Sequence, residues 1–259
     1  MRIALGIEYD GSRFSGWQMQ QHATRTVQQE LERALSVVAD EHIKVVCAGR
    51  TDTGVHATQQ VVHFDTRAVR PDKAWILGVN AHLPHDVSCL WSHPVADDFS
   101  ARFTATARQY RYIIHNRLAR PALLDQRVAW RHGPLDTTAM ESAAQVLVGE
   151  QDFSAFRSSM CQAEHARRCI HFINISRHGE FIYVDIAANA FLHHMVRNIV
   201  GSLLMVGTGE QPEEWIASLL ARRDRTLAGP TAPAQGLYLV KVTYSEHCNL
   251  PQQVLFPLL

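Results

Sequence analysis

The first hundred residues alternate between short apolar runs and longer amphipathic stretches. Thr26 and Gln29 have the spacing of a helix capping box, and apolar residues follow at helical intervals up to about Asp40. A second helix is predicted at 72–82, after Pro71. Strands are predicted around these helices, at 2–8, 43–48, 59–66 and 87–92. The predicted order is therefore β-α-β-β-α-β.

The rest of the chain repeats this order. Strands are predicted at 108–116, 169–176, 180–187 and 237–244, with helices at 135–148 and from 191 onward. A β-α-β-β-α-β unit is the arrangement of ferredoxin-like domains, an antiparallel sheet with both helices on one face. The sequence thus predicts an α+β fold of two ferredoxin-like (RRM-like) halves, 1–105 and 106–259, joined into one mostly antiparallel sheet with a central cleft.

Two segments of the second half have no counterpart in the first. One is an extra helix near 212–222, and the other is a long connection at 149–168 that carries Arg157, Arg167 and Arg168. Structureless connections of this length are uncommon in compact domains unless they are functional or disordered. We therefore regard 149–168 as a candidate substrate arm.

The formal net charge is zero, which by itself does not favour a nucleic-acid partner. The type of basic residue is more informative than the net charge. Only Lys44, Lys73 and Lys241 are lysines among the 25 basic residues, and the others are arginines. Arginine grips phosphate in bidentate fashion and stacks on bases, but a GC-rich genome would produce the same preference. Composition leaves both possibilities open.

Neither a membrane segment nor a disulfide framework is predicted. No apolar run approaches the roughly 18 residues that cross a bilayer. The five cysteines are odd in number and lack the C-x-x-C spacing of zinc or redox sites. We expect a soluble cytoplasmic protein with reduced thiols.

The segment 49–57 connects two predicted strands and contains the first candidate site. Gly49 and Gly54 bracket Arg50 and Asp52, and glycines permit a sharp bend that would push the carboxylate out of the sheet. An ordinary turn, in which Asp52 bonds its own backbone, accounts for the same residues. Local chemistry favours the turn.

Two further segments carry candidate binding residues. The predicted loop 10–18 combines Arg13 with Phe14 and Trp17, which suits phosphate contact and base stacking, although loop aromatics more often pin a loop to the core. In the helix from 191, Arg197 lies in the middle of the side opposite the apolar residues, where a plain surface arginine is the ordinary interpretation. The adjacent His193 and His194 lack the spacing of a helical metal site.

Taken together, the sequence motifs resemble the tRNA pseudouridine synthase A family. The matching pieces are Tyr9-Asp10-Gly11-Ser12, Gly16-Trp17-Gln18, Gly49-Arg50-Thr51-Asp52, Gly54-Val55-His56, Ala101-Arg102, Tyr110-Arg111-Tyr112, Phe191-Leu192-His193-His194-Met195-Val196-Arg197-Asn198, Ala228-Gly229-Pro230-Thr231-Ala232-Pro233 and Gly236-Leu237-Tyr238. The resemblance implies the pseudouridine synthase fold with an RNA-binding cleft. It also implies an enzyme that isomerises uridine to pseudouridine at positions 38, 39 and 40 of the tRNA anticodon stem-loop, acts as a homodimer, and uses no cofactor and no metal.

The resemblance also assigns roles to individual residues. Asp52 matches the catalytic carboxylate, which acts as a nucleophile or as a base. Arg50 matches the residue that helps to extrude the base, Arg197 the ion-pair partner of Asp52, and Tyr110 the ring packed on the flipped base. Leu237 is expected in an apolar wall of the pocket, and Arg13 and Trp17 are expected to contact the substrate.

Two alternatives from other functional classes stay open. A non-catalytic RNA-binding module would use the same arginines and aromatics, but neither half shows the aromatic-rich strand pattern of RNA-recognition domains. A carboxylate-dependent nucleosidase would ordinarily need a second acid, and none stands out near Asp52.

Overall fold

The computed structural model describes residues 1–19, 25–251 and 253–257. The chain divides into two compact units. The first contains Met1–Ala107 and Tyr238–Leu259, and the second contains Arg108–Leu237. Among the described residues, no helix is long and apolar enough to cross a membrane.

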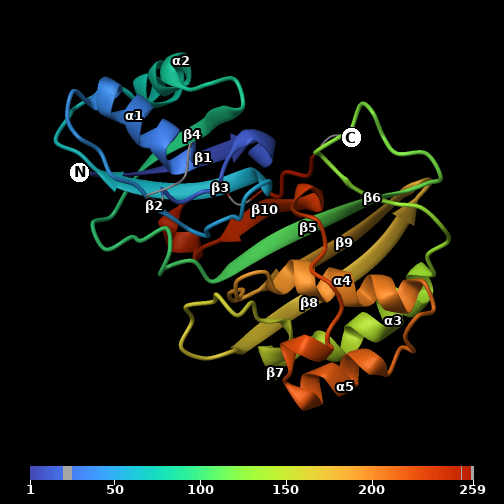
Figure 1. Cartoon of the computed structure of the whole chain (residues 1–259). Helices are drawn as coiled ribbons and strands as arrows, with labels where there is room; N and C mark the ends of the chain where they lie inside the picture. Colours follow the sequence, from blue (N-terminus) through green and yellow to red (C-terminus); the bar gives the residue numbers. More distant parts are fainter. Residues whose placement is uncertain (20–24, 252, 258–259) are drawn as a thin grey trace. The chain divides into compact units, whose positions relative to one another are not determined.

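The first unit is an antiparallel ferredoxin-like sheet extended by one parallel strand. Strand order is β4-β1-β3, with β2 antiparallel and β10 parallel to β3. Figure 1 shows the helices of this unit together on one side of the sheet. The elements are β1 (Arg2–Tyr9), α1 (Val27–Ala39), β2 (Val46–Cys47), β3 (His56–Asp65), a π-helical turn (Ala74–Gly78) continuing into α2 (Val79–His82), β4 (Val87–Val95) and β10 (Leu237–Thr243).

The predicted start and end of α1 are confirmed. The Thr26 hydroxyl accepts a hydrogen bond from the Gln29 amide at 3.3 Å, which caps the helix as the sequence predicted. Asp40 follows the last turn in the left-handed conformation, with φ of 56°. Leu31 and Leu35 on the inner face are fully buried, so this helix is held by its apolar stripe.

The second unit is an antiparallel sheet in the order β5-β9-β8-β7, with the short β6 parallel to β5. Asp136 caps α3 by accepting hydrogen bonds from the amides of Thr138 and Ala139 at 2.9 and 3.0 Å. The elements are β5 (Ala107–Asn116), β6 (Ala129–Arg131), α3 (Thr137–Ala144), β7 (Gly149–Asp152), β8 (Arg167–His178), β9 (Phe181–Ala188), α4 (Met195–Gly207) and α5 (Trp215–Arg222).

The α+β class and the mostly antiparallel pairing are confirmed, and three local predictions need correction. The helix expected from 191 begins at Met195, because His194 takes a left-handed conformation with φ of 62°. The connection 149–168 is not structureless, because β7 pairs with β8 and a 3-10 turn follows at Ser154–Phe156. Of the strand expected at 43–48, only Val46–Cys47 pairs with β3.

The last strand differs from its predicted place in the second half, 106–259. Tyr238 and Leu239 of β10 pair in parallel with His56 and Ala57 of β3. The Leu255 amide donates to the Val240 carbonyl at 3.4 Å, which fastens the following segment to β10. Tyr238–Leu259 therefore belong to the first unit.

Candidate active site

Asp52 lies in the turn that leads into β3, and its side chain is half-buried. Its backbone carbonyl accepts a hydrogen bond from the Val55 amide at 3.1 Å, and Gly54 completes the turn with φ of 78°. Arg50, two residues earlier, is exposed. The turn expected from the glycines is therefore present, and it carries a carboxylate and a solvent-facing guanidinium.

Thr51, which precedes Asp52, is bound by the end of β1 and by the loop that follows it. The hydroxyl groups of Tyr9 and Thr51 lie 2.7 Å apart, and the Trp17 amide donates to the Thr51 carbonyl at 3.0 Å. At Gly16, which has φ of 87°, an added Cβ would lie 2.8 Å from the Thr51 carbonyl oxygen. This backbone approach requires glycine, so the loop and the Asp52 turn form one rigid piece.

A second contact fixes the other end of the turn. A Cβ added at Gly11 would lie 2.0 Å from the carbonyl oxygen of Val55. The Gly11 amide donates to Nδ1 of His56 at 3.0 Å, and the His56 ring stacks on Tyr238 of β10 with centroids 4.6 Å apart. The contact with His56 and the hydrogen bonds from Ser12 hold the pKa of Asp10 well below its usual range, despite partial burial.

Phe14 and Trp17 pin the loop to the core, which was the alternative to base stacking in the sequence analysis. Trp17 and Phe14 are each only 2% exposed. The guanidinium of Arg25 lies 4.2 Å from the centre of the Phe14 ring. In this conformation the Trp17 ring is not available to stack on a base, and it anchors the loop instead. Arg13 is exposed, as a phosphate-contacting residue needs to be.

In the second unit, Tyr110 and Tyr112 are neighbours on one face of β5. Tyr110 is 8% exposed and meets the Phe191 ring edge-on, with centroids 5.1 Å apart. Tyr112 is fully buried and donates to the Pro233 carbonyl at 2.8 Å. Burial raises the pKa of the Tyr112 hydroxyl. Tyr110 is therefore the one of the two with an accessible edge, and Tyr112 anchors the segment that precedes Leu237.

Arg197 is half-buried on the first turn of α4. Its Nε donates to the Ala232 carbonyl at 2.8 Å, and the Ala232 amide donates back to the Arg197 carbonyl at 3.1 Å. A Cβ added at Gly201, one turn later, would lie 1.7 Å from the Pro230 carbonyl oxygen. The side of α4 that carries Arg197 thus packs against the segment 228–233, which disagrees with a plain surface arginine.

Asn198 is a supporting residue that the sequence analysis did not single out. It is fully buried, donates to the Phe156 carbonyl at 2.8 Å, and accepts from the Thr231 hydroxyl at 2.7 Å and from Arg225 at 3.0 Å. These bonds join α4 to two distant segments. A wheel diagram places Asn198 beside Arg197, but it cannot reveal partners that lie about thirty residues away.

The predicted site residues fall into two groups. Asp52, Arg50, Arg13 and Trp17 lie in the first unit, and Tyr110, Arg197 and Leu237 lie in the second. Leu237 is 6% exposed at the start of β10. Within each unit the residues are held by the contacts described above. The pairing of Asp52 with Arg197, and the approach of Tyr110 to the base, stay predictions.

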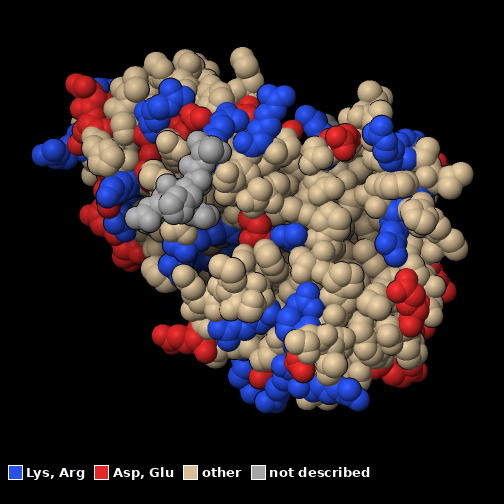
Figure 2. All heavy atoms as spheres, in the orientation of Figure 1, with Lys and Arg blue, Asp and Glu red and all other residues tan. Residues whose placement is uncertain are grey.

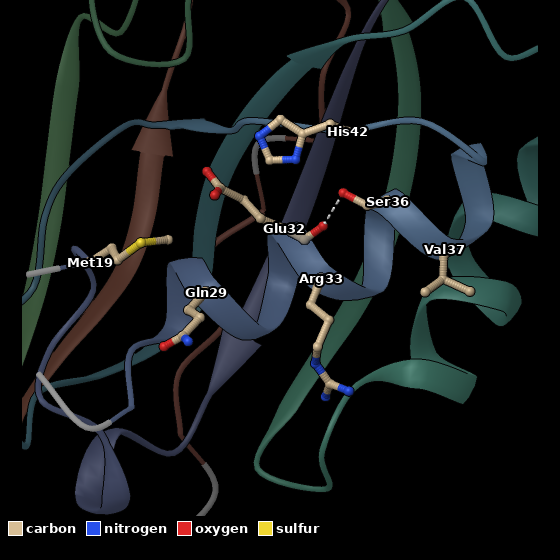
Figure 3. A pocket seen from close by; sticks show the side chains of 7 residues that line it. All are labelled: Met19, Gln29, Glu32, Arg33, Ser36, Val37 and His42. Atoms are coloured by element: carbon tan, nitrogen blue, oxygen red, sulfur yellow. Dashed lines mark hydrogen bonds between the residues drawn. The ribbon is translucent and has the colours of Figure 1, made fainter.

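A pocket on the outer side of α1 is separate from these residues (Figure 3). Its volume is about 480 Å³, and its lining is Met19, Gln29, Glu32, Arg33, Ser36, Val37 and His42. Two of its polar groups already bind neighbouring backbone: Glu32 accepts from the Val45 amide and Ser36 from the Ile43 amide, each at 3.0 Å. These groups fasten the segment before β2 to α1.

Comparison with known proteins agrees with the motifs. The family model for tRNA pseudouridine synthase matches residues 6–104 and 143–245. A tRNA pseudouridine synthase A from Shewanella amazonensis is 60% identical over 258 residues, which cover 100% of this chain and 98% of that protein. Another from Hydrogenovibrio crunogenus is 57% identical over 257 residues, 99% of this chain and 98% of that protein.

Among solved structures, a Cbf5-Nop10-Gar1 complex matches with a TM-score of 0.42 and 12% identity, covering 92% of this chain and 48% of that chain. This score is too low to argue for a shared fold. The family model and the full-length relatives establish the family without this structural match. The chain belongs to the tRNA pseudouridine synthase family.

Proposed function

We propose that the protein isomerises uridine to pseudouridine at positions 38, 39 and 40 in the anticodon stem-loop of tRNA. Membership of the family supports the reaction class and the RNA substrate. The observation that carries the proposal is the fixed turn around Asp52. Thr51, the residue before Asp52, is bound by Tyr9 and Trp17, so the backbone that carries the half-buried carboxylate is held in place.

The reaction needs only groups that the chain itself supplies. The bond between C1′ of the ribose and N1 of uracil breaks, the ring turns, and a bond between C1′ and C5 forms. C5 loses its proton and N1 gains one, so no electron leaves the substrate. Because atoms and electrons balance within the nucleoside, the scheme requires no redox cofactor.

Access to the uridine requires that it leave its stack, at a cost of a few kcal/mol that is least for weakly paired bases. Arg50 is suited to this step because it is exposed and lies two residues from Asp52. Its planar cation can fill the vacated space or hold the backbone phosphate. Arg13 is exposed in the neighbouring loop and is assigned to phosphate contact.

Asp52 is the catalytic residue in this proposal. It attacks C6 of the uracil or C1′ of the ribose, or it removes a proton from C2′. Arg197 keeps the carboxylate ionised, because an opposite charge offsets the effect of a dry site. Tyr110 packs on the flipped base and helps to remove the C5 proton, and Leu237 forms part of the apolar wall.

The oligomeric state and the cellular location belong to the same proposal. The enzyme acts as a homodimer in which one tRNA contacts both subunits, and it works in the cytoplasm where its substrate is found. Neighbouring target positions served by one site require recognition of tRNA shape rather than of base sequence.

Tritium release tests the reaction. The protein is incubated with a tRNA transcript that carries tritium at C5 of its uridines. The proposal predicts release of tritium without free uracil, because the base is rejoined through C5. Free uracil would identify a nucleosidase, and binding without release would identify an RNA-binding module.

A further inference from the structure

The connection between β7 and β8 is closed into a loop by one arginine. Arg157 donates from Nη2 to the carbonyls of Cys161 and Ala163, at 2.9 and 2.6 Å. The loop is also tied to the segment before α4, because the Ser158 amide donates to the His193 carbonyl at 3.1 Å. The Arg157 guanidinium is therefore held in place by backbone atoms, and it also makes a hydrogen bond with the Cys161 thiol.

A second arginine, Arg168, lies at the base of the same loop on β8. Its Nη1 donates to the carbonyls of His165 and Arg167, at 3.1 and 2.6 Å. Its Nε is buried and has no hydrogen-bond partner among the residues that the structure describes. Burial lowers the pKa of Arg168, interaction with the Cys161 thiol partly offsets this, and the charge of Arg157 lowers the pKa further.

Within the described ranges of the chain, neither guanidinium is paired with a carboxylate. No Asp or Glu oxygen in this part of the chain lies within 4.0 Å of Arg157 or Arg168, whose polar contacts are carbonyl oxygens, one histidine ring and the Cys161 thiol. The adjacent Arg167 differs, because its Nε lies 3.1 Å from Glu150. The Cys161 thiol, whose pKa Arg157 lowers, offsets part of the charge of Arg157 and Arg168. Two half-buried cations without a carboxylate partner are unfavourable, and an anion bound beside them would reduce that cost.

We propose that Arg157 and Arg168 form a binding site for one phosphodiester of the RNA backbone. The proposal rests on the tRNA substrate proposed above and names where one of its phosphates binds. Guanidinium forks bind phosphate oxygens in bidentate geometry, and Arg157 is already oriented by its two carbonyl bonds. Figure 2 shows Lys and Arg atoms over the lower part of the second unit, where Figure 1 places β7 and α5, beside smaller groups of Asp and Glu atoms.

The location suits a positioning role. The loop is bound to His193, and the chain runs from there directly into α4 and Arg197. A phosphate held at this loop would fix the RNA backbone beside the segment that carries a proposed catalytic arginine. Because phosphate contacts carry no base information, this site contributes affinity and register but no sequence preference.

The first test compares Arg168→Gln with the matched control Arg167→Gln. Affinity for an unmodified tRNA transcript is measured over a range of salt concentrations. Loss of one phosphate contact predicts roughly tenfold weaker binding by Arg168→Gln and a slope of log K against log salt that is smaller by about 1. Arg167→Gln is expected to bind like the wild type, because its partner is Glu150. Equal affinity and slope for Arg168→Gln and wild type would overturn the site.

The second test neutralises single phosphates in the RNA. Methylphosphonate linkages are placed one at a time in the anticodon arm, and binding by wild type and Arg168→Gln is compared. The proposal predicts one linkage whose neutralisation weakens the wild type roughly tenfold and leaves Arg168→Gln unaffected. Equal effects at every linkage in both proteins would contradict it. Thermal unfolding checks that the variant folds. If it does not, Arg168→Lys replaces it: the salt slope is expected to stay, but loss of the bidentate contact should weaken binding at that one linkage, and wild-type affinity would overturn the site.

Two further outcomes are informative. One distinguishes a site for an RNA phosphate from a site for a free anion, and the other separates failure of the phosphate site from failure of the proposed reaction. If inorganic phosphate stabilises the wild type but not Arg168→Gln while their RNA affinities are equal, the site takes a free anion and the RNA assignment is wrong. If the wild type shows the predicted phosphate dependence but releases no tritium, the phosphate site stands and the proposed reaction fails.

Discussion

The Tyr9 and Thr51 hydroxyl groups form a buried hydrogen bond of 2.7 Å, and Thr51 immediately precedes Asp52. The bond joins the end of β1 to the turn before β3, across 42 residues of sequence. It ties β1 to the residue next to the aspartate that we assign to catalysis. Groups that hold a reacting residue in position influence rate more than binding.

Tyr9→Phe removes this bond while keeping the ring. We expect a roughly tenfold fall in kcat with little change in KM, because Asp52 becomes less well oriented. The loss of a buried hydrogen bond is expected to cost about 1 kcal/mol in unfolding free energy. Tyr183→Phe is the control, because Tyr183 contacts Arg111 through its ring and that ring is retained. Wild-type kcat for Tyr9→Phe would remove the positioning role.

Gly16→Ala tests the close backbone approach at the same turn. Gly16 and Gly133 have similar positive φ angles, 87° and 83°, but only Gly16 faces an obstacle, the Thr51 carbonyl. An alanine at either position costs about 1–2 kcal/mol of backbone strain. We expect Gly16→Ala to lose more stability than Gly133→Ala in urea unfolding, because the clash with Thr51 adds to the strain, and only Gly16→Ala to lose activity, by at least about tenfold. Equal activities would show that the turn tolerates displacement.

Asn198→Ala tests the network behind Arg197. The variant loses the bonds with Phe156, Thr231 and Arg225, and we expect it to cost about 2–3 kcal/mol in unfolding free energy. The exposed Asn174→Ala is the control and should change stability by less than about 0.5 kcal/mol. Urea unfolding measures both. A small effect at Asn198 would mean that segment 228–233 is held by backbone packing alone.

Glu41 is expected to make the unfolding free energy of the protein depend on pH in the acid range. Hydrogen bonds from the Thr66 hydroxyl and the Arg67 amide lower the pKa of Glu41 from 4.5 to about 2. Because the folded pKa is lower than the unfolded one, this stabilisation is complete above about pH 4.5. It is lost as the pH falls towards about 2. We expect Glu41→Gln to be less stable at neutral pH and to lack this component of acid unfolding, with Glu213→Gln as the control. The measurement is unfolding free energy against pH, and parallel curves for Glu41→Gln and wild type would contradict the assignment.

Local signals in the sequence were sufficient for much of the fold. The Thr26 capping box and the apolar spacing after it located α1, because both depend on neighbouring residues. The same signals could not locate the partner of the last strand. Pairing of β10 with β3 depends on contacts between residues nearly two hundred positions apart. The start of α4 was also missed, because the left-handed His194 leaves the apolar pattern unchanged.

In the candidate site, too, features set by neighbouring residues were predicted, and features set by distant contacts were not. The glycines around Asp52 indicated a turn, whereas the position of Arg197 on its helix indicated a plain surface arginine, and only the family resemblance assigned it a role. The residues that hold them were not visible, because Tyr9 meets Thr51 and Asn198 meets Thr231 only in the folded chain. Trp17 illustrates the opposite error. A loop tryptophan suggested base stacking, but burial of its ring made it a structural anchor.

The most direct test of the proposed function is tritium release by Asp52→Asn, with RNA affinity measured on the same preparation. Asparagine keeps the size of the side chain and removes the carboxylate, and exposed Asp125→Asn is the matched control. We predict tritium release below about one hundredth of the wild-type rate, with tRNA affinity within about threefold of wild type. A near wild-type rate of release by Asp52→Asn would contradict the assignment of Asp52 as the catalytic residue.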